Sequence, residues 1–271
     1  MSIEEYKRQF PSLLFDMIDA RVLRITMSNP GKRNATSAAM HTDLTHVWRA
    51  VDMDKDVDVV LIEGEGDTFS AGGEFAMMEG IVNDLQERLR ICKEAKDLVY
   101  NIMNCSKPVV SAVRGAAVGA GLVIAVMADV SVVSRTAKLI DGHTRLGLAA
   151  GDHAVIAWPL LMGMAKAKYF LLTCRPMTGE TAERLGLMTM AVDDGEVHDT
   201  ALELARELAS GSATAIRWTK QTLNNWYKLA APSFEASVAF EFMGFGLPDV
   251  QEGIAALKER RQPVFNGPRG D

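Results

Sequence analysis

The stretch from Lys107 to Ser134 constrains the fold more than any other part of the chain. A β-branched run, Val109 to Val113, leads into small residues between Gly115 and Gly121, and an apolar run from Leu122 to Ala128 follows. A second β-branched run, Val130 to Val133, closes the stretch. This order predicts a buried strand, a tight glycine-rich turn, a helix and another strand.

The small residues of this turn would let a ligand approach the backbone closely. The first N–H groups of the following helix would point at that ligand, with the positive end of the helix dipole behind them. Such a site suits an anion or a developing oxyanion. A buried helix packed through alanine and glycine explains the same residues without a ligand, and the stretch alone does not decide between the two.

Length and composition predict a chain with a sizeable core. The chain has 271 residues, of which 48% are hydrophobic and 24% charged, which fits one large domain or a domain with an appendage. Strands and helices alternate in the first part, and helices alone follow. We therefore predict an α/β core over residues 1–195 and a C-terminal helical region, used for oligomerisation, over residues 196–271.

The N-terminal elements are predicted from local patterns. Residues 1–12 are expected to be a mobile or surface lead-in, and Leu13 to Met27 is expected to form a hairpin with its turn at Asp19–Ala20. A helix begins at Thr36 or Ser37 and runs to about Val51, and residues 82–105 form one long amphipathic helix. The histidines of the first helix are expected on its surface: His41 and His46.

Charge and cysteine content limit the partners and the compartment. The net charge of −6 argues against nucleic acid or an anionic membrane as the main partner. Cys92, Cys105 and Cys174 are an odd number without metal-like spacing, so we expect free thiols in the cytoplasm and no metal site. The N-terminus MSIEEYKRQF contains acidic residues and no apolar run, so we expect no signal peptide. The apolar run from Ala116 to Val133 contains Asp129, which argues against a membrane span.

Four segments, in this order, resemble the crotonase (enoyl-CoA hydratase/isomerase) superfamily: FSAGGEFAMM (69–78), KPVVSAVRGAAVGAGLVIA (107–125), RLGLAAGD (145–152) and MTGETAERLGLMTMAV (177–192). The resemblance extends from about Leu23 to Phe265. It implies an α/β fold, a crotonase-like spiral of ββα units with a C-terminal helical extension. It also implies a homotrimer or a dimer of trimers.

The resemblance further implies an acyl-CoA substrate and no tightly bound cofactor. The backbone N–H groups of Gly73 and Ala120 would form an oxyanion hole for a thioester carbonyl, and each such donor contributes about 3 kcal/mol. The positions that match the coenzyme A groove are Arg33, Asn34, Ala35 and Ala71. A solvated loop is the alternative interpretation of the cations at Lys32 and Arg33.

The sequence departs from the superfamily where hydratases carry two glutamates. Val123 and His143 occupy those positions. Valine cannot transfer a proton, so hydration by two carboxylates cannot run in its usual form. His143 can act as a general base, and Asp152 could bond one ring nitrogen and hold the other toward a water. Alternatively, His143 is a structural hydrogen-bonding group of its loop.

The pair of His143 and Asp152 resembles the β-diketone hydrolase branch of the superfamily, which includes oxocamphor hydrolase. That branch places a histidine side chain where this chain has Ala120. Three hypotheses follow: an acyl-CoA lyase or isomerase, a hydrolase of C–C bonds in free or CoA-linked diketones, and a non-catalytic binding protein. His153 could share the role of Asp152, and Glu74 could face the pocket; a helix-start histidine and a solvated acid are the alternatives.

Overall fold

Two β-sheets form the centre of the protein, whose computed structural model describes residues 1–19 and 21–267. Ala20 of the predicted hairpin turn and residues 268–271 of the predicted C-terminal region lie outside the described residues. In the larger sheet the strands lie in the order β1 (Leu13–Asp19), β2 (Val22–Met27), β3 (Val59–Gly64), β5 (Val109–Val113), β7 (Val130–Ser134) and β10 (Met190–Val192).

The first two strands of this sheet pair antiparallel, as the hairpin prediction requires, and all other pairings in it are parallel. The smaller sheet has the order β4 (Ser70–Ala71), β6 (Ala116–Val118), β8 (Lys138–Ile140) and β9 (Met177–Thr178). The α/β class predicted from the sequence is confirmed.

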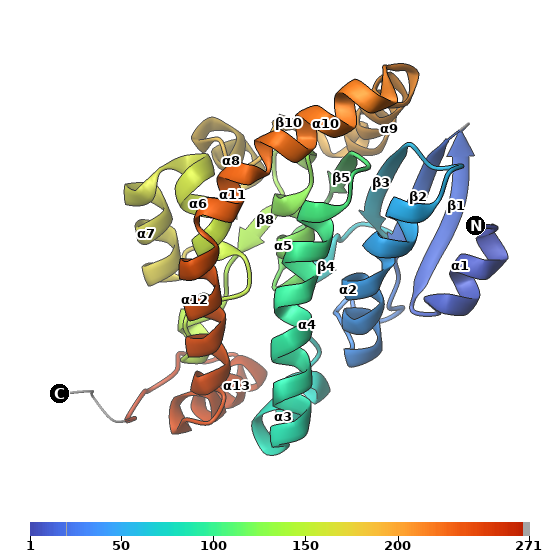
Figure 1. Cartoon of the computed structure of the whole chain (residues 1–271). Helices are drawn as coiled ribbons and strands as arrows, with labels where there is room; N and C mark the ends of the chain where they lie inside the picture. Colours follow the sequence, from blue (N-terminus) through green and yellow to red (C-terminus); the bar gives the residue numbers. More distant parts are fainter. Residues whose placement is uncertain (20, 268–271) are drawn as a thin grey trace.

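Helices cover the sheets and then continue alone after β10 (Figure 1). In the α/β part they are α1 (Ile3–Gln9), α2 (Ala38–Met53), α3 (Phe75–Asn83), α4 (Leu85–Asn104), α5 (Ala120–Met127), α6 (Ala154–Met162), α7 (Met164–Thr173) and α8 (Gly179–Leu185). The C-terminal helices are α9 (Val197–Ser210), α10 (Ala213–Leu223), α11 (Asn225–Leu229), α12 (Ala231–Gly244) and α13 (Pro248–Glu259). No helix among the described residues is long and apolar enough to span a bilayer.

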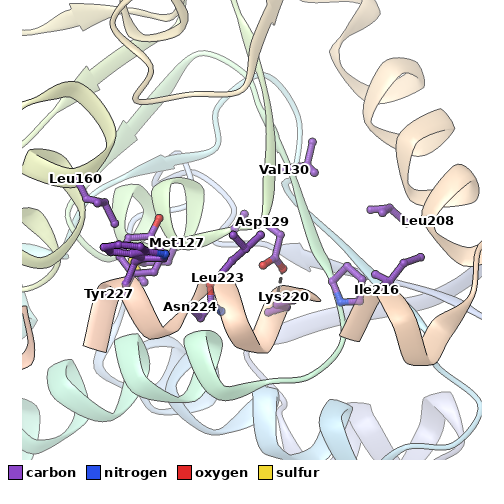
Figure 2. A pocket seen from close by; sticks show the side chains of 13 residues that line it. Met127, Asp129, Val130, Leu160, Leu208, Ile216, Lys220, Leu223, Asn224 and Tyr227 are labelled. Atoms are coloured by element: carbon purple, nitrogen blue, oxygen red, sulfur yellow. Dashed lines mark ion pairs between the residues drawn. The ribbon is translucent and has the colours of Figure 1, made fainter. Parts of the chain in front are cut away.

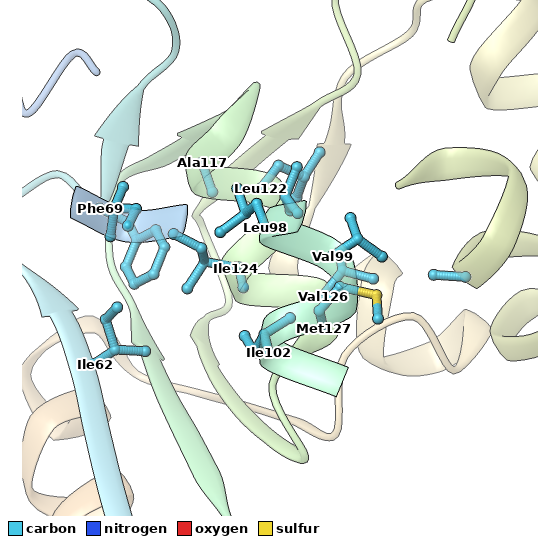
Figure 3. Packing of buried hydrophobic residues seen from close by; sticks show 14 of the residues in the cluster. Ile62, Phe69, Leu98, Val99, Ile102, Ala117, Leu122, Ile124, Val126 and Met127 are labelled. Carbon is cyan, nitrogen blue, oxygen red and sulfur yellow. The ribbon is translucent and has the colours of Figure 1, made fainter. Parts of the chain in front are cut away.

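The larger sheet is buried on both faces because successive side chains of a strand point to opposite sides. On β3, Val60 and Ile62 belong to the main core with α2, α4 and α5. Val59 and Leu61 of the same strand belong to a second core that includes Ala201 of α9. Figure 3 shows part of the main core, with side chains from β3, α4 and α5 packed together.

The stretch from Lys107 to Ser134 folds as β5, β6, α5 and β7. The predicted tight turn contains an additional short strand, β6, because the backbone of residues 116–118 pairs with β4 on one side and with β8 on the other. Gly119 then adopts φ +53° and precedes α5. A side chain at Gly121 would place its Cβ 2.3 Å from the Cβ of Ser70, so α5 starts directly against β4.

One predicted element is wrong. Residues 1–12 are not a mobile or surface lead-in, because α1 buries Tyr6, which stacks on Phe15 at 5.1 Å and donates a hydrogen bond to Asp54 at 2.9 Å. The predicted long helix over 82–105 is confirmed as α4, which begins at Leu85 and follows a separate helix, α3. The two helices separate at Asp84, whose carboxylate accepts the N–H groups that open α4.

Glycine at 253 lets α13 contact the loop of residues 142–152, because a Cβ there would lie 2.4 Å from the carbonyl oxygen of Leu146. We expect Gly253→Ala to lower the free energy of unfolding by about 1–3 kcal/mol through overpacking. Urea unfolding measures this change. Gly195→Ala is the control, because a Cβ at Gly195 meets nothing within 4 Å. Equal stability of the two variants would contradict a tight contact at α13.

Candidate active site

A cavity of about 400 Å³ lies between the glycine loops, the loop of residues 142–152 and the C-terminal helices. Among the predicted site residues, Ala71, Gly73, Ala120, His143 and Asp152 line it. The lining also includes apolar side chains of α3, α4 and α12, which form a hydrophobic wall: Met77, Met78, Ile81, Ile91, Phe242 and Phe245. The cavity is therefore mostly apolar. Its titratable groups are His143, Arg145 and Asp152 of the loop of residues 142–152, together with His41, Cys174 and Glu241 from other segments.

The backbones of the two glycine loops approach each other closely. A Cβ at Gly119 would lie 3.6 Å from the amide nitrogen of Gly73. Ala120 is the first residue of α5, so its N–H has no partner within the helix. Thr36 donates to the carbonyl of Gly72 and accepts from the N–H of Glu74. The N–H of Gly73, between these two contacts, therefore points away from Thr36.

Three carboxyl groups surround the imidazole of His143. Asp141 Oδ1 lies 3.0 Å from Nδ1, Glu241 Oε1 lies 3.4 Å from Nε2, and Asp152 Oδ2 lies 3.9 Å from Nε2. Burial alone lowers the pKa of His143, but the charges of Asp141 and Asp152, joined by that of Glu241 once it ionises, raise it well above its ordinary value. At neutral pH the imidazole therefore carries its proton and is set up to donate it.

The expected contact between Asp152 and His143 is thus not a hydrogen bond, since 3.9 Å is too long. Asp141 takes that place and also accepts the backbone N–H of His143 at 3.3 Å. The turn of the loop explains this arrangement, because Asp141 lies two residues before His143 and can reach both its backbone and its ring.

Asp152 hydrogen-bonds to His153 instead. Its Oδ1 lies 2.6 Å from His153 Nδ1, and the indole N–H of Trp158 donates to His153 Nε2 at 3.1 Å. Indole is only a donor, so His153 is the neutral tautomer with its proton on Nδ1. Burial by itself raises the pKa of Asp152, but the interactions with His153 and His143 hold it below its ordinary value. Asp152 thus faces the cavity as a carboxylate.

Asp141, Asp152 and His153 bring three possible metal-ligand atoms within 4.8 Å of one another, a grouping that sequence spacing did not indicate. However, both ring nitrogens of His153 already have partners in Asp152 and Trp158. His153 could bind an ion only by giving up one of these buried hydrogen bonds. The arrangement therefore fits a support for Asp152 better than a metal site.

The predicted coenzyme A positions fall into two groups. Ala71 lines the cavity, whereas Arg33, Asn34 and Ala35 lie in a neighbouring loop outside its lining. The buried amide of Asn34 donates to the carbonyls of Glu65 and Thr68, at 2.9 and 2.6 Å. Asn34 therefore shapes the loop with its side chain rather than offering it to a ligand, while Arg33 is exposed.

The loop acid Glu74 does not line the cavity. It lies just before α3, and its carboxylate pairs with Lys32 Nζ at 2.9 Å and with the amide of Asn29. The hydrogen bond from Lys32 holds the pKa of Glu74 below its ordinary value. The charge of Lys32 is therefore partly neutralised by a carboxylate of the neighbouring loop.

The sequence did not predict two of the residues that line the cavity, His41 and Glu241. His41 is buried, with Nδ1 2.9 Å from Glu94 on α4, so its predicted surface position is wrong, whereas His46 is exposed as predicted. Only the packing of α4 on α2 reveals this. Glu241 had a local signal, because it shares a helical stripe with Phe234, Val238 and Phe245, which are all buried.

A second cavity, of about 640 Å³, lies under α10 and α11 (Figure 2). Its polar feature is the ion pair of Asp129 and Lys220 at 2.7 Å, and Leu223 and Tyr227 cover much of the rest. Lys220 also donates to the carbonyl of Lys107 at 2.8 Å. None of the predicted catalytic residues lines this space, so the cavity at the glycine loops is the candidate active site.

Residues 17–268 match the family model described as enoyl-CoA hydratase/isomerase. The chain belongs to the enoyl-CoA hydratase/isomerase family. A probable enoyl-CoA hydratase of Bacillus subtilis is 30% identical, over 92% of this chain and 97% of its own length. The 1,2-epoxyphenylacetyl-CoA isomerase of Escherichia coli is 27% identical, with the same two coverages of 92% and 97%.

The crystal structure of an enoyl-CoA hydratase/isomerase from Mycobacterium paratuberculosis superposes on the family member described here with a TM-score of 0.86. The match covers 90% of this chain and 97% of that chain, at 27% identity. The predicted crotonase-like fold is thereby confirmed. The β-diketone hydrolase branch stays a prediction.

Proposed function

We propose that this enzyme binds an acyl-CoA thioester and stabilises its enolate between the backbone N–H groups of Gly73 and Ala120. The observation that carries the proposal is the meeting of the two glycine loops at the first turn of α5, on the wall of an apolar cavity. Removing one such donor costs about 3 kcal/mol of transition-state stabilisation. The N-terminal end of α5 adds a favourable dipole.

His143 and Asp152 would replace the two glutamates of hydratases in moving protons. Val123, at the first glutamate position, is buried and cannot contribute. His143 carries its proton and would supply it to the substrate carbon or to a leaving group, and its conjugate base would take one back. The reaction class is a lyase or isomerase step next to the thioester.

The acyl group would lie against the hydrophobic wall. The coenzyme A moiety would extend past Ala71 and along the loop of Arg33, Asn34 and Ala35. Neither a tightly bound cofactor nor a metal is part of the proposal. We also propose a cytoplasmic homotrimer or dimer of trimers, without nucleic-acid or membrane partners. Large exposed side chains on the C-terminal helices support association: Trp218, Trp226 and Leu229.

Thermal denaturation with ligands tests this function. A panel of acyl-CoA thioesters should raise the melting temperature, and a member present at 100 times its Kd adds about 2.7 kcal/mol of stability. The matching free acids are the control, because they lack the coenzyme A moiety. If no thioester in the panel shifts the melting temperature, acyl-CoA binding is wrong.

The second candidate is hydrolysis of a C–C bond in a β-diketone, free or linked to coenzyme A. It is favoured by His143 at one of the two positions where hydratases carry glutamates, and by the carboxylates of Asp141 and Asp152 near its ring. Cyclic β-diketones, offered to the wild type and to Asp152→Asn, test it directly. Equal activity of both proteins would exclude the proposed role of Asp152. Ligand binding without turnover of either substrate class would favour a non-catalytic member.

A further inference from the structure

Glu241 differs from the other two carboxyl groups around His143. It comes from α12, far along the chain from the loop of residues 142–152, and it lines the candidate cavity. Its side chain is 6% exposed, and the polar group near it is His143 Nε2, at 3.4 Å from Oε1. The cluster thus combines Asp152 of that loop and Asp141 directly before it with one acid of the C-terminal helices.

Asp141 and Asp152 each accept hydrogen bonds at Oδ1, Asp141 from the backbone and ring of His143 and Asp152 from His153. Among the described residues, Oδ2 of Asp141 and Oε2 of Glu241 are both buried without a hydrogen-bond partner. The difference lies in the other oxygen, because Oδ1 of Asp141 accepts two N–H groups, whereas Oε1 of Glu241 has the long 3.4 Å contact with His143 Nε2. A buried, unpartnered oxygen is far costlier on a charged group than on a neutral one. Glu241 is therefore the carboxyl that keeps its proton.

The charges of the cluster lead to the same assignment. One imidazolium cannot balance three buried carboxylates, and like charges at close range oppose joint ionisation. Burial raises the pKa of Glu241, and the attraction of His143 offsets this only in part. Further titratable groups around the cluster are the thiols of Cys92 and Cys174, both with a pKa raised by burial, and Arg145 of the cavity wall.

The backbone makes room for this carboxyl. A Cβ at Gly151 would lie 2.3 Å from Oε2 of Glu241, so any side chain at 151 would displace it. One turn earlier on α12, Ser237 donates to the carbonyl of Gly151 at 3.1 Å. The loop and the helix are therefore joined at the point where Glu241 approaches His143.

We propose that Glu241 stores the proton that His143 delivers, so that α12 supplies one half of the acid–base unit. Oε1 faces the protonated Nε2 at 3.4 Å, so Glu241 holds its proton on Oε2. His143 gives its Nε2 proton to the substrate, and the carboxyl group of Glu241 then turns its O–H toward the bare Nε2 and restores the imidazolium. The lyase or isomerase step also takes one proton from the substrate or from the added water, and that proton returns through His143 to the Glu241 carboxylate. Glu241 acts through His143 and is a positioning residue. This relay rests on the proposed function, whereas the stored proton does not.

Nuclear magnetic resonance of the full chain, labelled at histidine, tests the stored proton without any substrate. The ring signals of His143 should titrate in two steps, first as Glu241 loses its proton and then as His143 does. In Glu241→Gln the first step should vanish, and the second midpoint should fall by about 1 pH unit or more, because no negative charge at 241 holds the imidazolium.

Glu235→Gln is the matched control on the same helix, since Glu235 is exposed and contacts Tyr100 and Lys96 outside the cluster. It should titrate as the wild type does. If Glu241→Gln does not fold, Glu241→Met gives the same test, because an apolar side chain needs no partner there. Two unchanged steps in either variant would overturn the proposal, whatever the thioester panel shows.

With a thioester substrate in hand, the pH profile tests the relay itself. In Glu241→Gln the dependence of kcat on the first titration step should be lost, whereas Glu235→Gln should keep it. If kcat of Glu241→Gln still depends on the first titration step, the relay is refuted, whereas thioester binding is not. Absence of thioester binding would instead refute the proposed function.

Discussion

Replacing Ala120 with proline is expected to lower kcat about 10²- to 10³-fold and to leave the fold intact. Proline removes one N–H group, the proposed oxyanion donor. The position tolerates it, because Ala120 is the first residue of α5 and proline favours that site in helices. Gly119 has ψ −133°, outside the helical region that a following proline disfavours. Steady-state kinetics with a thioester substrate measures the loss.

Ala213→Pro is the matched control, because Ala213 is also the first residue of a helix, α10, and lies outside the candidate cavity. It should keep kcat at the wild-type level. Both variants should melt close to the wild type. A fully active Ala120→Pro enzyme would show that the N–H of residue 120 does not hold the substrate oxygen.

Exchange of His143 for glutamine should reduce kcat about 10²- to 10⁴-fold, the range for loss of a proton-transferring side chain. Glutamine retains hydrogen bonding but cannot carry the proton. Thermal denaturation separates this loss from misfolding, since removing a cation from among three buried acids also changes stability.

His198→Gln serves as the control for that change. His198 is partly exposed and pairs with Glu63 at 2.7 Å, away from the candidate cavity. Its replacement should leave kcat unaltered. Normal turnover in a folded His143→Gln enzyme would favour the structural interpretation of His143 given by the sequence.

Sequence patterns predicted what depends on neighbouring residues. The runs at Val109 to Val113 and Val130 to Val133 became β5 and β7. Ser37, one of the two predicted starting positions, caps α2 through its side chain. In each case, strand or helix preference and burial point the same way within a few residues.

Contacts between distant segments could not be predicted in this way. The partner of His41 is Glu94 on another helix, and the partner of His143 includes Glu241, almost at the other end of the chain. Local periodicity indicates that a face is buried but not what it meets. The resemblance located His143, whereas the surrounding charges that set its protonation came from tertiary packing.

The C-terminal helices have a consequence for how the enzyme matures. Glu241, Phe242 and Ala256 complete the wall of the cavity, yet a ribosome makes them after every strand of both sheets. A nascent chain with its sheets already formed would hold the oxyanion loops but lack the cover that keeps water from an enolate. Catalysis would therefore begin only when synthesis is nearly finished, so incomplete chains would not consume thioester substrates in unproductive reactions.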